Sequence, residues 1–293
     1  MLLKPFVKWA GGKTGLLAQL RRAYPPELGT TVRRYCEPFV GGGAVLFDIL
    51  SSYTLDEVYI CDSNREIINV YRAVQCGVEE LTARLKLLQQ CYHALDSNGR
   101  QALYYGMRDC FNALDLAEEI NFEKAALFIF LNRTCFNGLY RVNKSGKFNV
   151  PIGAYKKPLI CDEANFKLIS KALSGVQIHC GDYSESLGFI DSGTFVYIDP
   201  PYRPLSRSSS FTAYNTASFD EAEQIRLAEF VDSLDSRGAR VLLSNSDPKN
   251  MNTQDDFFEE LYEGFNIARV SARRAINSKA ESRGKISELL ISN

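Results

Sequence analysis

The sequence predicts an α/β protein: an open sheet of buried strands with a mainly helical segment inserted into it. One observation is the apolar run Thr194–Ile198, which leads into Asp199 and then into two prolines that end any strand. Another is a strand, a glycine-rich turn and an apolar helix across residues 33–47. Helical periodicity dominates residues 64–159 and strands resume at Val176, so the sheet is built from chain on both sides of an insertion.

The composition is that of an ordinary globular protein. The chain has 293 residues, 45% of them hydrophobic and 24% charged, which is enough for one large domain or two modest ones. No apolar run is long enough to span a membrane and the amino end lacks the pattern of a signal peptide, so we expect a cytoplasmic protein without membrane contact. The eight cysteines include no C-x-x-C pair and there are only two histidines, which argues against a zinc site and favours reduced thiols.

Acidic residues occur at the ends of three predicted strands. They are Asp62, Asp182 and Asp199. Ligands of open α/β sheets bind outside the carboxyl ends of the strands, so these side chains are candidates for a binding site. Asp62 also lies roughly 20 residues beyond the glycines at 41–43, where an acid that binds a ribose belongs. The glycine spacing departs from the dinucleotide-binding pattern, and each signal is weak alone, but together they predict a nucleoside-containing cofactor.

A second glycine pair precedes a helical pattern near the amino end. Gly11 and Gly12 allow main-chain amides to approach an anionic ligand, with Lys13 beside them. The triplet Gly-Lys-Thr does not form a nucleotide-binding P-loop, because that pattern requires glycine where this chain has Val7. A plain glycine turn is the alternative interpretation.

A basic segment without acids lies at the end of the helical region. No acidic residue occurs between Lys124 and Cys161, and turn residues and aromatics are interleaved with the bases. Because the formal net charge of the whole chain is -1, this local excess favours a nucleic-acid surface over a solvated basic face, which stays open as the alternative. The basic residues of the segment are Arg133, Arg141, Lys144, Lys147, Lys156 and Lys157.

Two further stretches carry weaker signals. A serine-rich stretch at residues 205–211 is predicted to order over a substrate. The end of the chain is predicted to form two strands, at residues 265–270 and 286–291. The loop between these strands is interpreted either as a phosphate contact or as an exposed hairpin tip. The basic residues there are Arg273, Arg274, Lys279, Arg283 and Lys285.

Several stretches, in order along the chain, resemble Dam-type DNA adenine methyltransferases. The strongest are Lys-Trp-Ala-Gly-Gly-Lys at 8–13, Glu-Pro-Phe-Val-Gly-Gly-Gly at 37–43 and Asp-Pro-Pro-Tyr at 199–202. Residues 137–141, 148–151 and 282–286 are similar to the same family, so the match covers nearly the whole chain. Several motifs in the right order are far more specific than any one of them.

The resemblance implies a fold and its division. We expect a seven-stranded, Rossmann-like sheet of an S-adenosylmethionine-dependent methyltransferase, with an inserted and mainly helical target-recognition domain. Residues 1–63 and 161–293 would form the catalytic domain, and residues 64–160 the insertion that recognises DNA.

The resemblance also implies site residues. Asp62 would hold the ribose hydroxyls of S-adenosylmethionine and Asp182 its adenine. The cofactor set is Trp9, Ala10, Gly11, Gly12, Lys13, Glu37, Pro38, Phe39, Gly41, Gly43, Asp62, Asp182, Tyr183 and Asp199. The DNA set is Lys8, Arg133, Asn137, Leu139, Arg141, Asn143, Lys144, Lys147 and Pro151, of which Lys8, Leu139, Arg141 and Pro151 match positions that read GATC. Ala154 stands where many relatives have arginine, so a phosphate contact is missing.

The catalytic set is Asp199, Pro200 and Tyr202. The exocyclic amino group of adenine is a poor nucleophile, because its lone pair is delocalised into the ring. Asp199 and the Pro200 carbonyl would accept its two hydrogens and localise that lone pair, and a sulfonium donor needs neither a metal nor a covalent intermediate. The target base must leave the duplex, at a cost of roughly a few kcal/mol. Stacking on Tyr202 would return about 1–3 kcal/mol of that cost.

The sequence therefore predicts an enzyme, a site-specific adenine-N6 methyltransferase that acts on double-stranded DNA as a monomer, alone or with a cognate restriction endonuclease. Cytosine-N4 methyltransferases use similar chemistry, but more often have serine in place of Asp199. A nucleotide-binding oxidoreductase leaves the basic segment unexplained. A non-catalytic DNA-binding protein has no need of acids at three strand ends.

Overall fold

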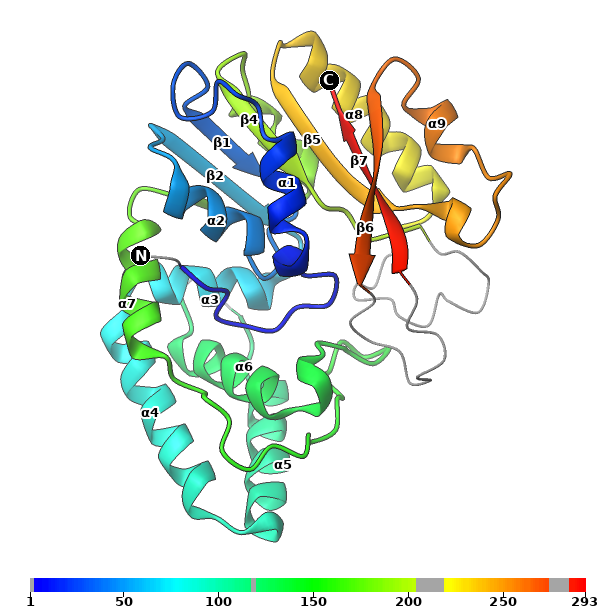
Figure 1. The fold of residues 1–293 in the computed structure, drawn as a ribbon. Coiled ribbons are helices and arrows are strands. Elements are labelled where there is room, and N and C mark those ends of the chain that lie inside the picture. The colour runs from blue at the N-terminus through cyan, green and yellow to red at the C-terminus, as the bar shows by residue number, and fades with distance from the viewer. Residues whose placement is uncertain (1–2, 117–119, 204–218, 274–284) are drawn as a thin grey trace.

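Figure 1 shows the computed structural model, which describes residues 3–116, 120–203, 219–273 and 285–293. Its sheet has the strand order β3-β2-β1-β4-β5-β7-β6, and β7 runs antiparallel to both of its neighbours. This order confirms the predicted seven-stranded, Rossmann-like sheet. The strands are β1 (Arg34–Glu37), β2 (Glu57–Asp62), β3 (Gln177–Cys180), β4 (Thr194–Ile198), β5 (Arg240–Ser246), β6 (Asn266–Arg273) and β7 (Lys285–Ser292).

The strand β4 lies at the centre of the sheet, between β1 and β5, and all five of its residues are buried. Its side chains alternate between the two faces, as the pleat requires. Phe195 and Tyr197 join the hydrophobic core on one face, whereas Val196 and Ile198 join the core on the other. A parallel strand covered on both faces is apolar at every position, which explains why the run reads so clearly in the sequence.

Helices cover both faces of the sheet. The core that contains Phe195 also receives side chains of α1, α2, α3 and α7, whereas the opposite core receives those of α8 and α9. Asn64 begins α3 by accepting hydrogen bonds from the amides of Glu66 and Ile67 at 3.0 and 3.2 Å. These helices are α1 (Leu17–Ala23), α2 (Ala44–Ser52), α3 (Arg65–Cys76), α7 (Glu163–Ala172), α8 (Glu221–Ser236) and α9 (Phe257–Leu261).

The insertion lies below the sheet in Figure 1. Its helices are α4 (Val78–Ala94), α5 (Ser97–Ala113) and α6 (Phe122–Thr134). Residues 124–132 of α6 are all buried, so this helix is the centre of the insertion. The helix α3 packs against β2 and β3 as well as against α6, and one continuous hydrophobic core joins both parts. The predicted boundary at residue 64 therefore falls at the start of a helix that the two parts share.

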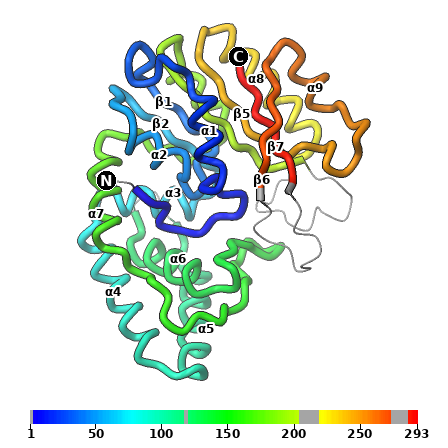
Figure 2. The backbone as a smooth tube through the Cα atoms, in the orientation of Figure 1, coloured from blue at the N-terminus to red at the C-terminus, as the bar shows by residue number. Residues whose placement is uncertain are grey.

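The N-terminal segment links the two parts. In Figure 2 the blue tube runs between the sheet and the green insertion before it enters the short 3-10 helix η1 (Lys13–Gly15). Asn132 of α6 fixes it, because its side chain accepts from the Lys8 amide and donates to the Lys8 carbonyl, both at 2.8 Å. Residues 8–13 are thereby held against both parts of the protein.

Some predicted features lie outside the described residues. They include the serine-rich stretch 205–211 and the basic residues Arg274, Lys279 and Arg283. In the described part of the chain, no helix is long and apolar enough to cross a membrane.

Gly43 is expected to tolerate no side chain. Its φ of 71° is left-handed, and an added Cβ would overlap the Tyr71 hydroxyl and lie 3.0 Å from the Phe47 ring. Gly175 is the matched control, because its φ is 82° but nothing lies within 4 Å of its Cβ position. Gly175→Ala should lower the free energy of unfolding in urea by about 1–2 kcal/mol through backbone strain. Gly43→Ala should lose about 1–3 kcal/mol more through overpacking, and equal losses would contradict the close packing.

Candidate active site

The predicted strand-end acids and the glycine-rich turn lie together at the carboxyl ends of the parallel strands. Asp62 ends β2, Asp182 follows β3 and Asp199 follows β4. The glycine-rich turn after β1 lies at the same edge, since parallel strands end on one side of a sheet. The sequence therefore placed these acids at the correct edge.

Lys13 forms an ion pair with Asp199. Its Nζ lies 2.6 Å from Oδ1 and 2.7 Å from Oδ2 of the carboxylate, and the lysine is only 3% exposed. A buried ammonium group needs such a counter-charge. The turn at Gly11, with a φ of 75°, brings the lysine to this position, and the Gly11 carbonyl accepts a further hydrogen bond from Nζ at 2.9 Å. The sequence predicted that Lys13 binds the cofactor, whereas in the structure its ammonium group pairs with the Asp199 carboxylate.

Ser244 holds Asp199 from the other side. Its hydroxyl donates to Oδ1 at 3.0 Å and itself lies 2.9 Å from the Tyr197 hydroxyl. An ionised carboxylate has about four positions that accept hydrogen bonds. Two groups therefore orient Asp199 and still leave it able to accept an N–H of a substrate.

Tyr202 continues the network. Its hydroxyl accepts from Lys13 Nζ at 2.9 Å and donates to Glu288 Oε2 at 3.0 Å. Burial raises the pKa of Tyr202, so the phenol keeps its hydrogen. Burial likewise raises the pKa of Glu288. Sequence reasoning missed Ser244 and Glu288, because they come from β5 and β7 and carry no motif of their own.

The glycine-rich turn packs against Trp9. A Cβ on Gly41 would lie 2.7 Å from the indole Nε1, and one on Gly42 would lie 2.8 Å from Trp9 Cβ. The Trp9 ring also stacks on Tyr140, with ring centroids 5.8 Å apart. The absence of side chains at Gly41 and Gly42 therefore makes room for Trp9.

Asp62 and Glu37 differ in their surroundings. Asp62 accepts from the amides of Gly41 and Asn64, both at 2.9 Å, and burial raises its pKa. Glu37 is 2% exposed and accepts from the Tyr35 hydroxyl at 2.7 Å; burial raises its pKa well above the ordinary value. Asp62 therefore fixes the main chain of the glycine-rich turn, whereas Glu37 is held within the core by Tyr35.

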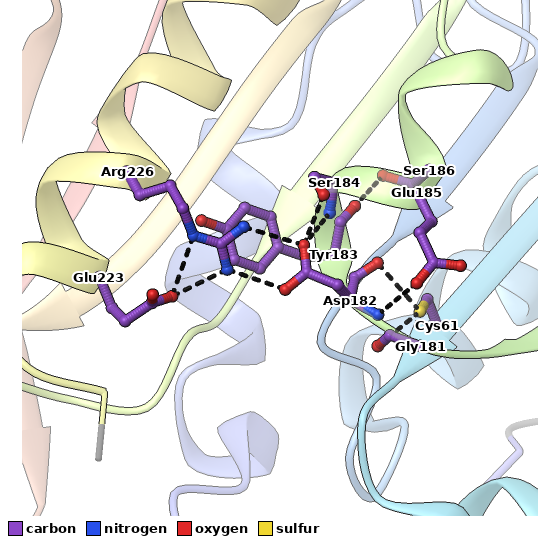
Figure 3. A network of polar contacts seen from close by, with 9 residues as sticks. All are labelled: Cys61, Gly181, Asp182, Tyr183, Ser184, Glu185, Ser186, Glu223 and Arg226. Carbon is purple, nitrogen blue, oxygen red and sulfur yellow. Dashed lines mark hydrogen bonds and ion pairs between the residues drawn. The ribbon is translucent and has the colours of Figure 1, made fainter. Parts of the chain in front are cut away.

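Asp182 is engaged by Arg226 of α8 (Figure 3). Two guanidinium nitrogens donate to its two carboxylate oxygens at 3.0 and 2.8 Å, and this pairing lowers the pKa of Asp182 to about 2. Asp182 also caps the following 3-10 helix through the Ser184 amide. The Arg226 guanidinium lies over the Tyr183 ring at 4.4 Å and contacts Glu223 at 2.8 Å.

An aromatic pair lies beside this carboxylate. The rings of Phe39 and Tyr183 are 5.1 Å apart, and Pro38 and Phe39 lead from β1 into the glycine turn. Carboxylates at the ends of two strands, a glycine-rich turn and aromatic rings are the groups that a charged nucleoside cofactor requires. The residues present therefore fit S-adenosylmethionine.

The predicted DNA residues cluster in the segment that follows α6. The Arg141 side chain is exposed, and its Nε donates to Asn149 Oδ1 at 2.8 Å across a hairpin. The side chain of Asn143 accepts from the amides of Ser145 and Lys147, which closes the tip. Lys144 and Lys147 are exposed at this tip.

A second part of this surface surrounds Lys8. The Lys8 ammonium group lies 3.0 Å from the Tyr155 hydroxyl and 4.2 Å from the centre of its ring. Gly138 packs directly on the Lys8 side chain, after the left-handed Asn137 with a φ of 55°. Phe136, which the sequence analysis missed, is 52% exposed, and its amide donates to the Pro151 carbonyl at 2.9 Å.

Arg133 differs from the other predicted DNA residues because its side chain contacts the main chain of the N-terminal segment. Its guanidinium donates to the Phe6 carbonyl at 2.9 Å and burial lowers its pKa. These contacts fix the N-terminal segment to α6 and give Arg133 a structural role, whereas its predicted role in binding DNA stays a prediction.

The chain matches the family of D12 class N6 adenine-specific DNA methyltransferases over residues 9–276. It belongs to this family. It is 48% identical to the Type II methyltransferase M.MjaIII of Methanocaldococcus jannaschii, with 100% of both chains covered. It is 37% identical to the Type II methyltransferase M1.LlaDCHI of Lactococcus lactis, covering 99% of this chain and 95% of the relative. It is 36% identical to a DNA adenine methylase of Escherichia coli, covering 98% and 94%.

Family membership confirms the predicted activity. The enzyme transfers a methyl group from S-adenosylmethionine to adenine in DNA. The fold, the fit of the strand-end acids and the basic segment agree with this activity.

Arg226→Ala should return the pKa of Asp182 toward the ordinary value of about 3.9, because the guanidinium is the largest cause of its depression. Carbon-13 NMR titration of the aspartate carboxyl groups measures this change. Arg240→Ala is the control, since it removes a guanidinium that pairs with Glu27 at 3.6 Å instead. An unchanged pKa of Asp182 in Arg226→Ala would refute the pairing.

Proposed function

We propose that the enzyme methylates N6 of adenine within GATC, after the adenine has left the duplex. The observation that carries this proposal is the position of Asp199, which two groups orient at the end of the central strand while part of its carboxylate stays free to accept. The resemblance of residues 137–141 and 148–151 to readers of GATC supports the choice of sequence.

Asp199 and the Pro200 carbonyl accept the two amino hydrogens of the target adenine. This localises the lone pair on N6 and stabilises the positive charge that develops there during transfer. Lys13 gives the carboxylate its counter-charge, and Tyr202 stacks on the extruded base. When bound, S-adenosylmethionine would supply the methyl group: as the N6–CH3 bond forms, the S–CH3 bond of the sulfonium breaks, S-adenosylhomocysteine leaves as a neutral thioether, and N6 loses one hydrogen as a proton to solvent.

The glycine-rich turn and the acids at the ends of β2 and β3 would hold the cofactor. Asp62 accepts from the ribose hydroxyls and Asp182 from the amino group of the cofactor's adenine. Arg226 donates one hydrogen bond to Oδ2 of Asp182 at 2.8 Å, and a carboxylate oxygen has two lone pairs, so Oδ2 can accept this contact while Arg226 stays in place. Glu223 contacts Arg226 at 2.8 Å and helps to hold it there.

The hairpin after α6 reads the DNA. Arg141 donates two hydrogen bonds to the major-groove edge of a guanine, and Asn149 orients its planar guanidinium. Lys144 and Lys147 neutralise phosphates. Lys8, Leu139, Asn137 and Pro151 face the bases near the target. The exposed ring of Phe136 fills space that the extruded adenine leaves.

We also propose that the enzyme acts as a monomer alongside a cognate restriction endonuclease, close to the DNA of its own cell. Two of its similar relatives are named type II methyltransferases, which supports this arrangement.

Asp199→Ala should lower the single-turnover methylation rate by about a hundredfold or more, because it removes the acceptor for N6. Its dissociation constant for S-adenosylmethionine should stay within a few fold of wild type. Asp62→Ala is the matched contrast, and should weaken cofactor binding by about 1–3 kcal/mol in calorimetry. If Asp199→Ala turns over normally with saturating DNA and cofactor, the catalytic assignment fails.

Arg141→Ala should lose discrimination of about 1–3 kcal/mol at one base pair of GATC. Methylation rates on duplexes with each GATC position varied measure this loss. Lys144→Ala and Lys147→Ala are the controls, since they should weaken binding to all duplexes alike and reduce the salt dependence. Rates that fall equally on every duplex in Arg141→Ala would mean that Arg141 contacts phosphate and reads no base.

A further inference from the structure

Glu288 is an acid at the active site to which neither a motif nor the mechanism above gives a role. It lies on β7 opposite Ser246, near the carboxyl end of β5. Within the described residues, the hydrogen bond that its side chain makes is the one from the Tyr202 hydroxyl at 3.0 Å. The charged groups that face it there are Lys13 and Asp199. Glutamate is rarely buried unless it has a partner, so the half-buried carboxylate of Glu288 is not explained by its place in the sheet alone.

The hydrogen bond to Glu288 fixes the direction of the Tyr202 hydroxyl. A phenol has a single hydrogen, and here that hydrogen points to Glu288 Oε2. The lone pairs of the phenol oxygen are then free to face Lys13 Nζ, which lies 2.9 Å away. Without an acceptor at position 288, the hydroxyl hydrogen would have no fixed direction.

The orientation of Lys13 depends in turn on Tyr202. An ammonium group has three hydrogens, and Lys13 directs them to the Gly11 carbonyl, the Tyr202 oxygen and the Asp199 carboxylate. The direction of each N–H group is fixed because the other two N–H groups also have acceptors. By orienting the Tyr202 hydroxyl, the hydrogen bond to Glu288 thus helps to orient the Lys13 ammonium group beside Asp199.

We propose that Glu288 is a positioning residue for methyl transfer. By accepting the Tyr202 hydrogen it turns the phenol oxygen to Lys13, which holds Asp199 in the arrangement that receives the amino group of adenine. This inference rests on the proposed role of Asp199. Glu288 itself touches neither the adenine nor the cofactor in this account.

The test is a double-mutant cycle between Glu288 and Tyr202, read as single-turnover transfer of a labelled methyl group to duplex DNA. Glu288→Ala should slow transfer by about tenfold, the loss of one oriented hydrogen bond. Glu288→Gln should stay within about threefold of wild type, since its amide oxygen still accepts from Tyr202. Tyr202→Phe should lose as much as Glu288→Ala, and adding Glu288→Ala to it should cause no further loss.

Readouts other than rate separate positioning from a structural role. The dissociation constants of Glu288→Ala for DNA, by fluorescence anisotropy, and for S-adenosylmethionine, by calorimetry, should match those of wild type. Glu263→Ala, which removes an exposed acid before β6, should change none of these quantities.

Two results would overturn the inference. One is a wild-type rate in Glu288→Ala, and the other is an equal further loss when Glu288→Ala is added to Tyr202→Phe. If wild type transfers no methyl group to adenine, or Asp199→Ala stays active, the proposed function fails instead. A normal Glu288→Ala beside an active wild type and an inactive Asp199→Ala refutes the role of Glu288 alone.

Discussion

The ion pair between Lys13 and Asp199 is the interaction on which the rest of the site depends. Both groups are largely shielded from water, and the ammonium group is almost fully buried. Because burying an unpaired charge costs free energy, each group requires the opposite charge of the other. The pair joins the first residues of the chain to the end of the central strand. It also determines which part of the carboxylate stays free for a substrate, since Ser244 and Lys13 hold the remainder.

Residues 8–13 connect Lys8, for which we propose a contact with DNA, to Lys13 at the proposed catalytic Asp199. Within six consecutive positions, Lys8 is held by Asn132 of the insertion, Trp9 packs on the glycine-rich turn and Lys13 pairs with Asp199. The base-reading contact that we propose for Lys8 is therefore separated from the proposed catalytic carboxylate by one short segment that contains a turn. This arrangement offers a direct physical route by which binding of the correct sequence affects the site.

The sequence predicted what is local in the chain. The strand β4, the acids at the strand ends and the basic hairpin each carry a pattern within a few residues, and the structure has them where the patterns indicate. It did not reveal Ser244 and Glu288, which reach Asp199 and Tyr202 only because β5 lies beside β4 and β7 lies beside β5 in the sheet order. The sequence also did not reveal the contact of Arg133 with the Phe6 carbonyl, because charge is visible in a sequence, whereas the buried carbonyl group that accepts from it is not.

The central claim is that Asp199, oriented by Lys13, receives the amino group of an adenine extruded from GATC. The most direct test is a crystal structure of the enzyme with a GATC duplex and a non-reactive analogue of S-adenosylmethionine. The account predicts N6 of that adenine at about 2.9 Å from a carboxylate oxygen of Asp199 and from the Pro200 carbonyl, with the Lys13 pair intact. A fully ordered complex in which the adenine stays stacked in the duplex, or its amino group points away from Asp199, would contradict it.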